Sequence, residues 1–349
     1  MASRDGSCQL AIDLGAGSVR VGLAGEAVPS RIFQTGALSY APGVHAAAAA
    51  LEQDVLEEVL QELPVIFGEH AAERPTLLVS CPNAAPPSLR KRVLERSFEA
   101  GASRVAILHS AAVSAIGTGR CDALVVDVGA GLTSVAPVRG GRVQRSGLRE
   151  HPFGGRSLDA MVLEVLRQQG VSLEKSKTTT TSARSARKRS RLDSLLSLSV
   201  HRLAQDLKET VCFCAHVPLA ELPADEPYHH TLPDGQVIEV TSFSRPVPEA
   251  LLVGNAGSSG ADFPGVPGLV VQAVESLEGT GKAGEVLLVG GSSRFVNFKD
   301  RLQTALSESG LGQVHAPKHR YASWLGLSIA STLGTSLVRR YTKVEFHEL

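Results

Sequence analysis

The sequence predicts an α/β protein made of two similar halves that face each other across a cleft. Residues 13–25 read DLGAGSVRVGLAG and residues 127–141 read DVGAGLTSVAPVRGG, so one motif occurs twice, about one subdomain apart. Each copy follows an apolar strand, at residues 9–12 or 124–126, and leads into alternating apolar residues. Glycine has no Cβ and adopts positive φ, so the backbone N–H groups of such a turn can approach a phosphate. The repetition therefore predicts a phosphate-bearing ligand between the halves.

A dinucleotide-binding fold is the main alternative interpretation of these glycine turns. In that fold the turn reads G-x-G-x-x-G and opens a helix. Here Gly15, Ala16 and Gly17 are followed by the residues SVR, without a third glycine in place. Val19 and Val21 then continue with the period of a strand. We therefore expect each loop to connect two strands.

Five further blocks of sequence follow in a fixed order. They are PFGGRSLD at 152–159, QDLKETVCFCA at 205–215, LPDGQVIE at 232–239, EVLLVGGSSRFVN at 285–297 and RYASWLGLSIASTLG at 320–334. In this series the chain resembles the actin family over nearly its whole length, from about Leu10 to Glu348, and LPDGQVI is a highly specific string.

The resemblance implies an actin-like ATPase fold, in which two RNase H-like halves surround a cleft that holds ATP and a divalent cation. It implies a first half at residues 1–140 and a second half at 141–318. Residues 319–349 would form a C-terminal segment that returns to the first half.

Composition agrees with a globular protein of this kind. The chain has 349 residues, is 43% hydrophobic and is formally neutral, which suffices for two sizeable cores. No apolar run approaches the length of a membrane span, and the first residues, MASRDGSCQL, lack the apolar region of a signal peptide. The five cysteines fit a reducing compartment, and Cys212 and Cys214 are interpreted as buried free thiols. We expect no metal site built from cysteines.

One small lobe of the family is largely deleted in this sequence. Only residues 34–41 separate the segment that resembles the lobe's entry, at 31–33, from residues 43–63, which resemble the family's next helix. In the family this lobe carries a loop that inserts into the next filament subunit. The resemblance thus implies that half of the longitudinal filament contact is lost.

At the positions that match the hydrolytic groups of the family, this sequence has residues that lack the required functional groups. Ala16 stands in place of a hydroxyl and Ala130 in place of an acid. Ser110 and Ser134 replace a glutamine and a histidine that orient the attacking water, and both are too short to reach it. Loss of one positioning group typically costs about 10²–10³ in rate. We therefore expect no catalytic residues and no hydrolysis.

Nucleotide binding is a separate expectation, because most matching binding positions are kept. Arg20 stands where the family has a phosphate-contacting lysine, Lys208 and Glu209 match an adenosine-side pair, and Arg320 matches a lysine that contacts the base. The glycines could instead persist for packing alone. If ATP or ADP binds, with Mg²⁺, it would be a structural ligand held by the candidate residues Asp13, Gly15, Ala16, Gly17, Arg20, Asp127, Gly129, Gly131, Lys208, Glu209, Gly290, Gly291 and Arg320.

An insertion at about 173–195 is rich in Ser, Thr and Arg and has no aromatic residues. This composition cannot bury a core, so we expect it to be disordered. Residues 188–191, with Arg184 and Arg187, form a basic cluster. The cluster could be a nuclear signal, a docking site for an acidic partner or a solvated loop.

These departures favour a non-hydrolysing actin-related structural protein, acting as a cytoskeletal complex subunit or a filament-end cap. A subunit with one longitudinal face ends a filament, because a heterologous contact propagates only if both faces are present. Divergent family members of this kind are the actin-related protein at the dynactin pointed end and the actin-like proteins of the sperm-head cytoskeleton.

The partners would be other actin-family or cytoskeletal proteins in the cytoplasm, without direct contact to nucleic acid or membrane and without homopolymers. The alternatives are a nuclear actin-related subunit of a chromatin-remodelling complex, targeted by the basic insertion, and an active ATPase.

Overall fold

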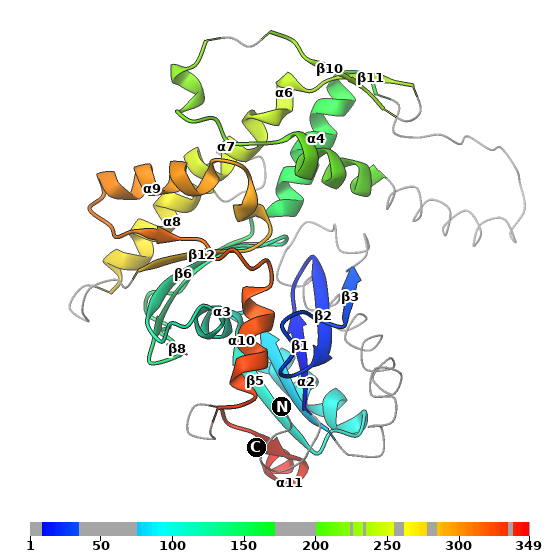
Figure 1. Ribbon diagram of the computed structural model, residues 1–349, viewed down its shortest axis with the longest axis vertical. Helices are drawn as coiled ribbons and strands as arrows, with labels where there is room; N and C mark the ends of the chain where they lie inside the picture. The colour runs from blue at the N-terminus through cyan, green and yellow to red at the C-terminus, as the bar shows by residue number, and fades with distance from the viewer. Residues whose placement is uncertain are drawn as a thin grey trace, which may run out of the picture.

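The computed structural model describes residues 9–34, 75–171, 200–223, 226–232, 235–254, 262–277, 285–333 and 338–348. Within these ranges the chain forms two α/β halves, each built around one mixed sheet (Figure 1). The predictions for the shortened lobe beyond Gln34, for a helix over 43–63 and for disorder over 173–195 concern residues outside this part of the chain.

The first sheet has the strand order β14-β5-β4-β1-β2-β3. Its strands are β1 (Gln9–Leu14), β2 (Ser18–Leu23), β3 (Arg31–Gln34), β4 (Thr76–Cys81), β5 (Arg104–His109) and β14 (Tyr341–Thr342). Helix α2 (Pro87–Glu99) covers it with Val93, Leu94 and Phe98, as the amphipathic pattern after Pro87 predicts. The short C-terminal helix α11 (Lys343–His347) contributes Phe346 to the same core.

The second sheet has the order β13-β12-β6-β7-β8, and β9 pairs with β7. Its strands are β6 (Ala123–Val128), β7 (Thr133–Arg139), β8 (Arg142–Val143), β9 (Arg149–His151), β12 (Val286–Val289) and β13 (Val314–His315). Because β6 already belongs to this sheet, the boundary between the halves lies between residues 117 and 123, not at the expected residue 140. Gly140 and Gly141 turn a hairpin inside the second half.

The two sheets repeat one topology. In the first, β1 pairs antiparallel with β2 and parallel with β4, and β4 pairs parallel with β5. In the second, β6 pairs antiparallel with β7 and parallel with β12, and β12 pairs parallel with β13. Both glycine loops therefore connect two strands of a hairpin, as the strand period predicts. They lie at equivalent places in the two halves.

Helices cover the second sheet and are packed on one large core. They are α4 (Gly155–Gln168), a helix over 200–211, α6 (Thr241–Ser244), α7 (Pro246–Val253), α8 (Gly265–Glu275) and α9 (Phe298–Glu308), with 3₁₀ turns η3 (Leu219–Glu221) and η4 (Ser292–Arg294). A small hairpin of β10 (His229–Thr231) and β11 (Val237–Glu239) lies at the far end of this half (Figure 1).

Helix α9 is fixed to α7 by a buried ion pair. Arg301 meets both carboxylate oxygens of Glu249, at 3.0 and 2.6 Å, and also donates to the carbonyls of Ala215 and Val217. Cys212 and Cys214 lie near this region as buried free thiols, and burial raises the pKa of each to about 12. The interpretation of these cysteines as inert core residues is therefore supported.

Two helices join the halves at their base. Helix α3 (Ser110–Gly117) leads from β5 to β6, and α10 (Ala322–Ala330) packs across it. A Cβ built on Gly326 would lie 1.6 Å from the carbonyl oxygen of Val113, so the helices meet backbone to backbone. Since β14 pairs with β5, the C-terminal segment returns to the first sheet.

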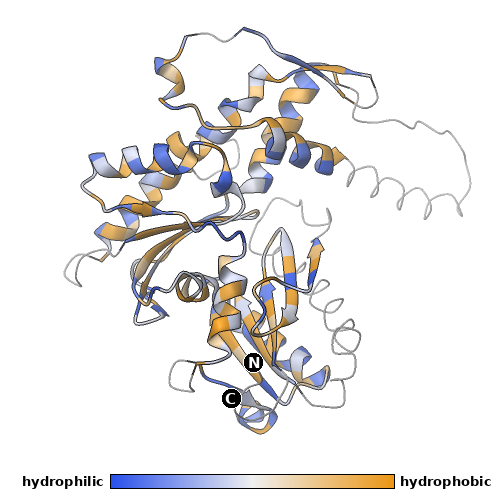
Figure 2. Ribbon diagram, viewed as in Figure 1, coloured by the Kyte–Doolittle hydropathy of each residue, from blue (hydrophilic) through white to orange (hydrophobic). Residues whose placement is uncertain are grey.

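The central strands of both sheets are predominantly hydrophobic, as Figure 2 shows. All residues of β4 and β12 are buried. Among the described residues, no helix has the length and apolar character required to cross a membrane.

Candidate functional site

The two glycine loops, residues 15–17 and 129–132, lie directly against each other. A Cβ built on Gly17 would lie 2.8 Å from the Cβ of Ala130, and a Cβ on Gly131 would lie 3.0 Å from the Cβ of Ala16. Each loop therefore contributes one alanine and one glycine to a reciprocal contact. A side chain at either glycine would require the facing alanine to shift.

Asp13, at the end of β1, is a buried carboxylate with three donors. It accepts hydrogen bonds from Ser80 Oγ at 2.6 Å, from Ser323 Oγ at 2.7 Å and from Arg20 Nη1 at 2.7 Å. These donors come from β4, α10 and β2, so one carboxylate connects three elements of the first half. A charge-assisted set of this kind satisfies the carboxylate within the protein.

Arg20, which the resemblance matches to a phosphate-contacting lysine, is engaged by protein groups. Its guanidinium pairs with Asp13 and lies over the ring of Tyr321, 5.5 Å from the ring centroid. The guanidinium of the exposed Arg320 lies 5.6 Å from the same centroid. Arg20 and Arg320 are thus brought together around one aromatic ring.

Asp127 is the matching acid at the end of β6. No hydrogen-bond donor of the described residues reaches its carboxylate, whereas the charge of Asp13 is close enough to affect it. Burial and then the repulsion of Asp13 raise the pKa of Asp127 to about 6, and Arg20 opposes this shift. The site therefore holds two carboxylates, of which Asp13 accepts three hydrogen bonds and Asp127 accepts none from the described residues.

Lys208 is buried beside the second loop and is occupied by internal partners. Its ammonium lies 2.6 Å from Asp159 and donates to the carbonyl of Gly155 at 3.0 Å. Burial raises the pKa of Asp159, and the neighbouring Lys208 charge opposes that shift. Glu209 is exposed and accepts from Gln205, one helical turn earlier.

The glycine turn after β12 approaches the second loop closely. Gly290 adopts φ 98°, and a Cβ on it would lie 2.4 Å from the carbonyl of Val128 and 2.5 Å from Asp127 Oδ1. Only glycine fits this position. Next to it, a Cβ on Gly291 would meet no atom of the described residues within 4 Å, so the turn borders open space.

Ser110 and Ser134 are joined through a buried residue that the motifs did not indicate, Asn83. The Asn83 amide oxygen accepts from Ser110 Oγ at 3.2 Å and from the Ala111 N–H at 3.0 Å. Its amide nitrogen donates to Ser134 Oγ at 3.1 Å. Ser134 donates in turn to Glu150 at 3.4 Å. The two positions matched to water-orienting groups are therefore linked to each other through protein atoms.

A histidine fixes the turn that carries Asn83. His109 hydrogen-bonds the backbone of Pro82 and Asn83, and its Nε2 lies 2.9 Å from Nη2 of Arg90. A guanidinium can only donate, so Nε2 accepts and the ring is neutral. Burial, with the charges of Arg90 and Arg145, lowers the pKa of His109 to about 4.

Arg156, the second residue of α4, also crosses between the halves. Its guanidinium donates to the carbonyl of Ala16 in the first loop. Its own N–H donates to the carbonyl of Ala130 at 2.8 Å. The block PFGGRSLD contains this arginine, but nothing in the sequence alone indicates which carbonyl it would reach.

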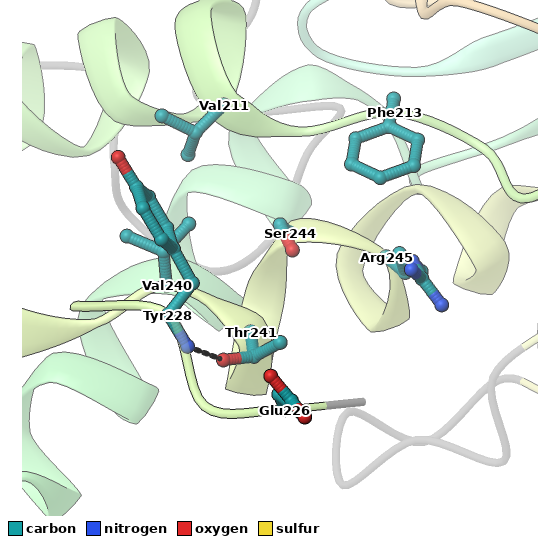
Figure 3. Close-up of a pocket in the computed structure, with 8 residues that line it drawn as sticks. All are labelled: Val211, Phe213, Glu226, Tyr228, Val240, Thr241, Ser244 and Arg245. Carbon is teal, nitrogen blue, oxygen red and sulfur yellow. Dashed lines mark hydrogen bonds between the residues drawn. The ribbon is translucent and has the colours of Figure 1, made fainter. Parts of the chain in front are cut away.

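A second concave site lies in the outer part of the second half, away from the glycine loops. It has a volume of about 330 Å³ and is lined by Val211, Phe213, Glu226, Tyr228, Val240, Thr241, Ser244 and Arg245 (Figure 3). The Arg245 guanidinium lies 5.6 Å from the Phe213 ring centroid, and the Tyr228 N–H donates to Thr241. Among the described residues, no group of three or more His, Cys, Asp or Glu side chains could hold a metal ion.

Comparison with known proteins identifies the family to which this fold and cleft belong. A family model described as Actin matches residues 46–349. The chain belongs to the actin family. The matched residues include the second glycine loop but not the first, which the structure adds through the equivalent position of its hairpin.

Curated proteins similar to this chain include actin-related and actin-like proteins. Actin-related protein 4 of Oryza sativa subsp. indica is 25% identical over 318 residues, covering 79% of this chain and 69% of the relative. Actin-related protein 4 of Schizosaccharomyces pombe is 25% identical over 319 residues, covering 78% and 74%. Actin-like protein 7B of Homo sapiens is 26% identical over 308 residues, covering 85% and 67%. The chain is thus a divergent actin-related protein.

The actin family implies a nucleotide and a divalent cation, and the residues of this cleft fit these groups in part. The unpaired Asp127 carboxylate beside Asp13 is a donor set that a hard cation accepts. The open space beside Gly291 leaves room next to the backbone. Arg20 and Lys208, however, each already neutralise an internal carboxylate. The fit therefore rests on backbone groups and Asp127.

The pKa shifts of Asp127 and His109 predict opposite pH effects on stability. Between pH 6 and 4 the folded state takes up a proton at Asp127 before the unfolded state does, so acidification stabilises the fold. Between pH 6.5 and 4 the unfolded state protonates at His109 first, so acidification destabilises it. The two contributions oppose each other in one window.

Asp127→Asn removes the group whose protonation stabilises the fold on acidification. We expect the variant to be more stable than the wild type at pH 7.5 by roughly 1–2 kcal/mol in EDTA, and to lose stability more steeply down to pH 4.5. His109→Gln should lose stability less steeply than the wild type over the same pH range, because it removes the group that favours the unfolded state on acidification. Urea unfolding at several pH values measures both. An Asp127→Asn variant less stable than the wild type at pH 7.5 would contradict the assignment.

Proposed function

We propose that this actin-related protein is a non-hydrolysing structural subunit of a fixed multiprotein assembly. The observation that carries the proposal is the engagement of the cleft side chains by one another. Ser110 and Ser134 are bridged by Asn83, and the loops meet through Ala16 and Ala130, which can neither donate to a phosphate nor hold a metal-bound water. This arrangement of the cleft favours a structural role for the protein over repeated ATP hydrolysis.

A bound nucleotide would have a structural role. Its phosphates would lie at the backbone of the two loops, its Mg²⁺ near Asp13 and Asp127, and its base near Gly290, Gly291 and Arg320. Mg²⁺ would supply charge neutralisation for the phosphates and for the uncompensated Asp127. A ligand at 100 times its Kd would stabilise the fold by about 2.7 kcal/mol.

We favour a nuclear assembly and keep a cytoskeletal filament end as the alternative. Similarity to proteins named actin-related protein 4 supports an actin-related subunit. The basic residues 184–191 in the sequence favour nuclear targeting. The cytoskeletal alternative, as a complex subunit or a filament-end cap, rests on the short spacing after Gln34.

The purified protein should show no ATP hydrolysis above background, because Ala16, Ala130, Ser110 and Ser134 cannot position the attacking water. Ala130→Asp alone should not restore turnover, since the water-orienting groups remain absent. Phosphate release in the presence of Mg²⁺ and ATP measures this. Turnover that Asp127→Asn abolishes would contradict the proposal.

The protein should remain monomeric yet purify with defined partners at fixed stoichiometry. Sedimentation with ATP, Mg²⁺ and salt tests the first part, and pelleting filaments of the pure protein would refute it. Affinity purification with mass spectrometry identifies the assembly. Nuclear localisation that deletion of 184–191 abolishes would support the nuclear assembly, whereas co-purified cytoskeletal subunits would support the cytoskeletal one.

A further inference from the structure

Contacts that join one protein group directly to another cross the cleft at two places. The first is the Asn83 network, in which Asn83 Nδ2 donates to Ser134 Oγ at 3.1 Å and the Ala84 N–H donates to Glu150 at 3.3 Å. Asn83 and Ala84 lie in the turn between β4 and α2 of the first half. Ser134 and Glu150 lie on β7 and β9 of the second half.

The second crossing is at the loop tips. Arg156 of the second half donates to the Ala16 carbonyl of the first half, and the loops touch through their alanine and glycine positions. Ser134 pairs with Asp127 in the β6–β7 register, so the Asn83 network lies within the same hairpin as the second loop. Both crossings thus lie at the β6–β7 hairpin turn, one through Ser134 on β7 and the other through Arg156, whose N–H donates to Ala130 in the turn.

From these contacts we infer that the halves are held closed by hydrogen bonds within the chain itself, without dependence on nucleotide. We name the set Asn83, Ala84, Ser134, Glu150, Arg156 and Ala16 the cleft clasp. It goes beyond the proposed function, because it describes how the cleft is held whichever assembly takes the protein. A clasped scaffold presents one fixed surface to its partners.

Burial gives the clasp its strength. Asn83 is 4% exposed and Ser134 is 3% exposed. The hydrogen bond between them is continued by Ser110 on one side of the cleft and by Glu150 on the other. Opening the cleft would leave the Asn83 amide and the Ser134 hydroxyl to be rehydrated, and each lost hydrogen bond shifts the balance towards the open form. The small residues Ala16 and Ala130 permit the close approach that brings Arg156 within reach of the carbonyl.

The matched control is Gln169. Its side-chain amide also makes three hydrogen bonds, to Glu239 twice and to Ser242, but all of them lie within the second half. Gln169→Ala therefore removes the same number of amide hydrogen bonds as Asn83→Ala without touching the cleft. Gln169 controls for the loss of an amide at an exposed position, and Ser134→Ala, which keeps the two bonds of Asn83 to α3, isolates the bond that crosses the cleft.

The test is a distance measurement between spin labels on the full-length protein. Labels at Ile32→Cys and Val237→Cys place one probe on β3 and one on β11, at positions 42% and 60% exposed, in a background with Cys8 and Cys121 replaced by Ser. Spectra are recorded after removal of nucleotide with apyrase and EDTA, and again with Mg²⁺ and ATP.

The clasp predicts one distance for the wild type and for Gln169→Ala, unchanged by nucleotide removal. Asn83→Ala should gain a second, longer distance in the stripped sample, with the open-to-closed ratio raised about tenfold. Ser134→Ala, which leaves Asn83 bonded to α3, should shift in the same direction and serves if Asn83→Ala does not fold. A wild-type distance that lengthens on stripping, or a Ser134→Ala distance identical to that of the wild type, would overturn the inference. Neither result depends on ATPase or partner assays.

Discussion

The reciprocal contact of Ala16 with Gly131 and of Gly17 with Ala130 fixes how the two halves meet. Each sheet brings its hairpin loop to the same place, and the loops approach closely because no side chain larger than a methyl group lies between them. That approach brings the Ala16 carbonyl within reach of Arg156 and sets β7 beside the Asn83 turn. The geometry of the cleft thus depends on four small residues.

Charge in the cleft follows from the same closeness. Asp13 and Asp127 lie at equivalent strand ends, close enough for the charge of Asp13 to raise the pKa of Asp127. Arg20 and two hydroxyls donate hydrogen bonds to Asp13 alone. Asp127 is left with a raised pKa, so a cation bound beside it would favour its ionised form. In the proposed account, a nucleotide would be a stabilising ligand, and protein contacts would hold the shape of the cleft.

The sequence predicted the features that depend on local pattern. The alternation after Gly17 predicted hairpins in place of a helix, and the repeated motif predicted two equivalent halves. The sequence did not indicate Asn83, Glu150 or Arg156, because their partners lie 51, 66 and 140 residues away and only the tertiary fold brings them together. It also set the domain boundary at a glycine pair that turns a hairpin, and it could not show that Arg20 faces a carboxylate.

Hydrogen–deuterium exchange of the two loops and the Asn83 turn is the most direct measurement of the central claim. If protein contacts hold the cleft closed, amides at 15–17, 83–84 and 129–134 should exchange equally slowly with Mg²⁺ and ATP and after their removal, and a shift should occur only in variants that break the crossing bonds. Exchange at these amides that accelerates strongly when nucleotide is removed from the wild type would show that the ligand, and not the chain, holds the halves together.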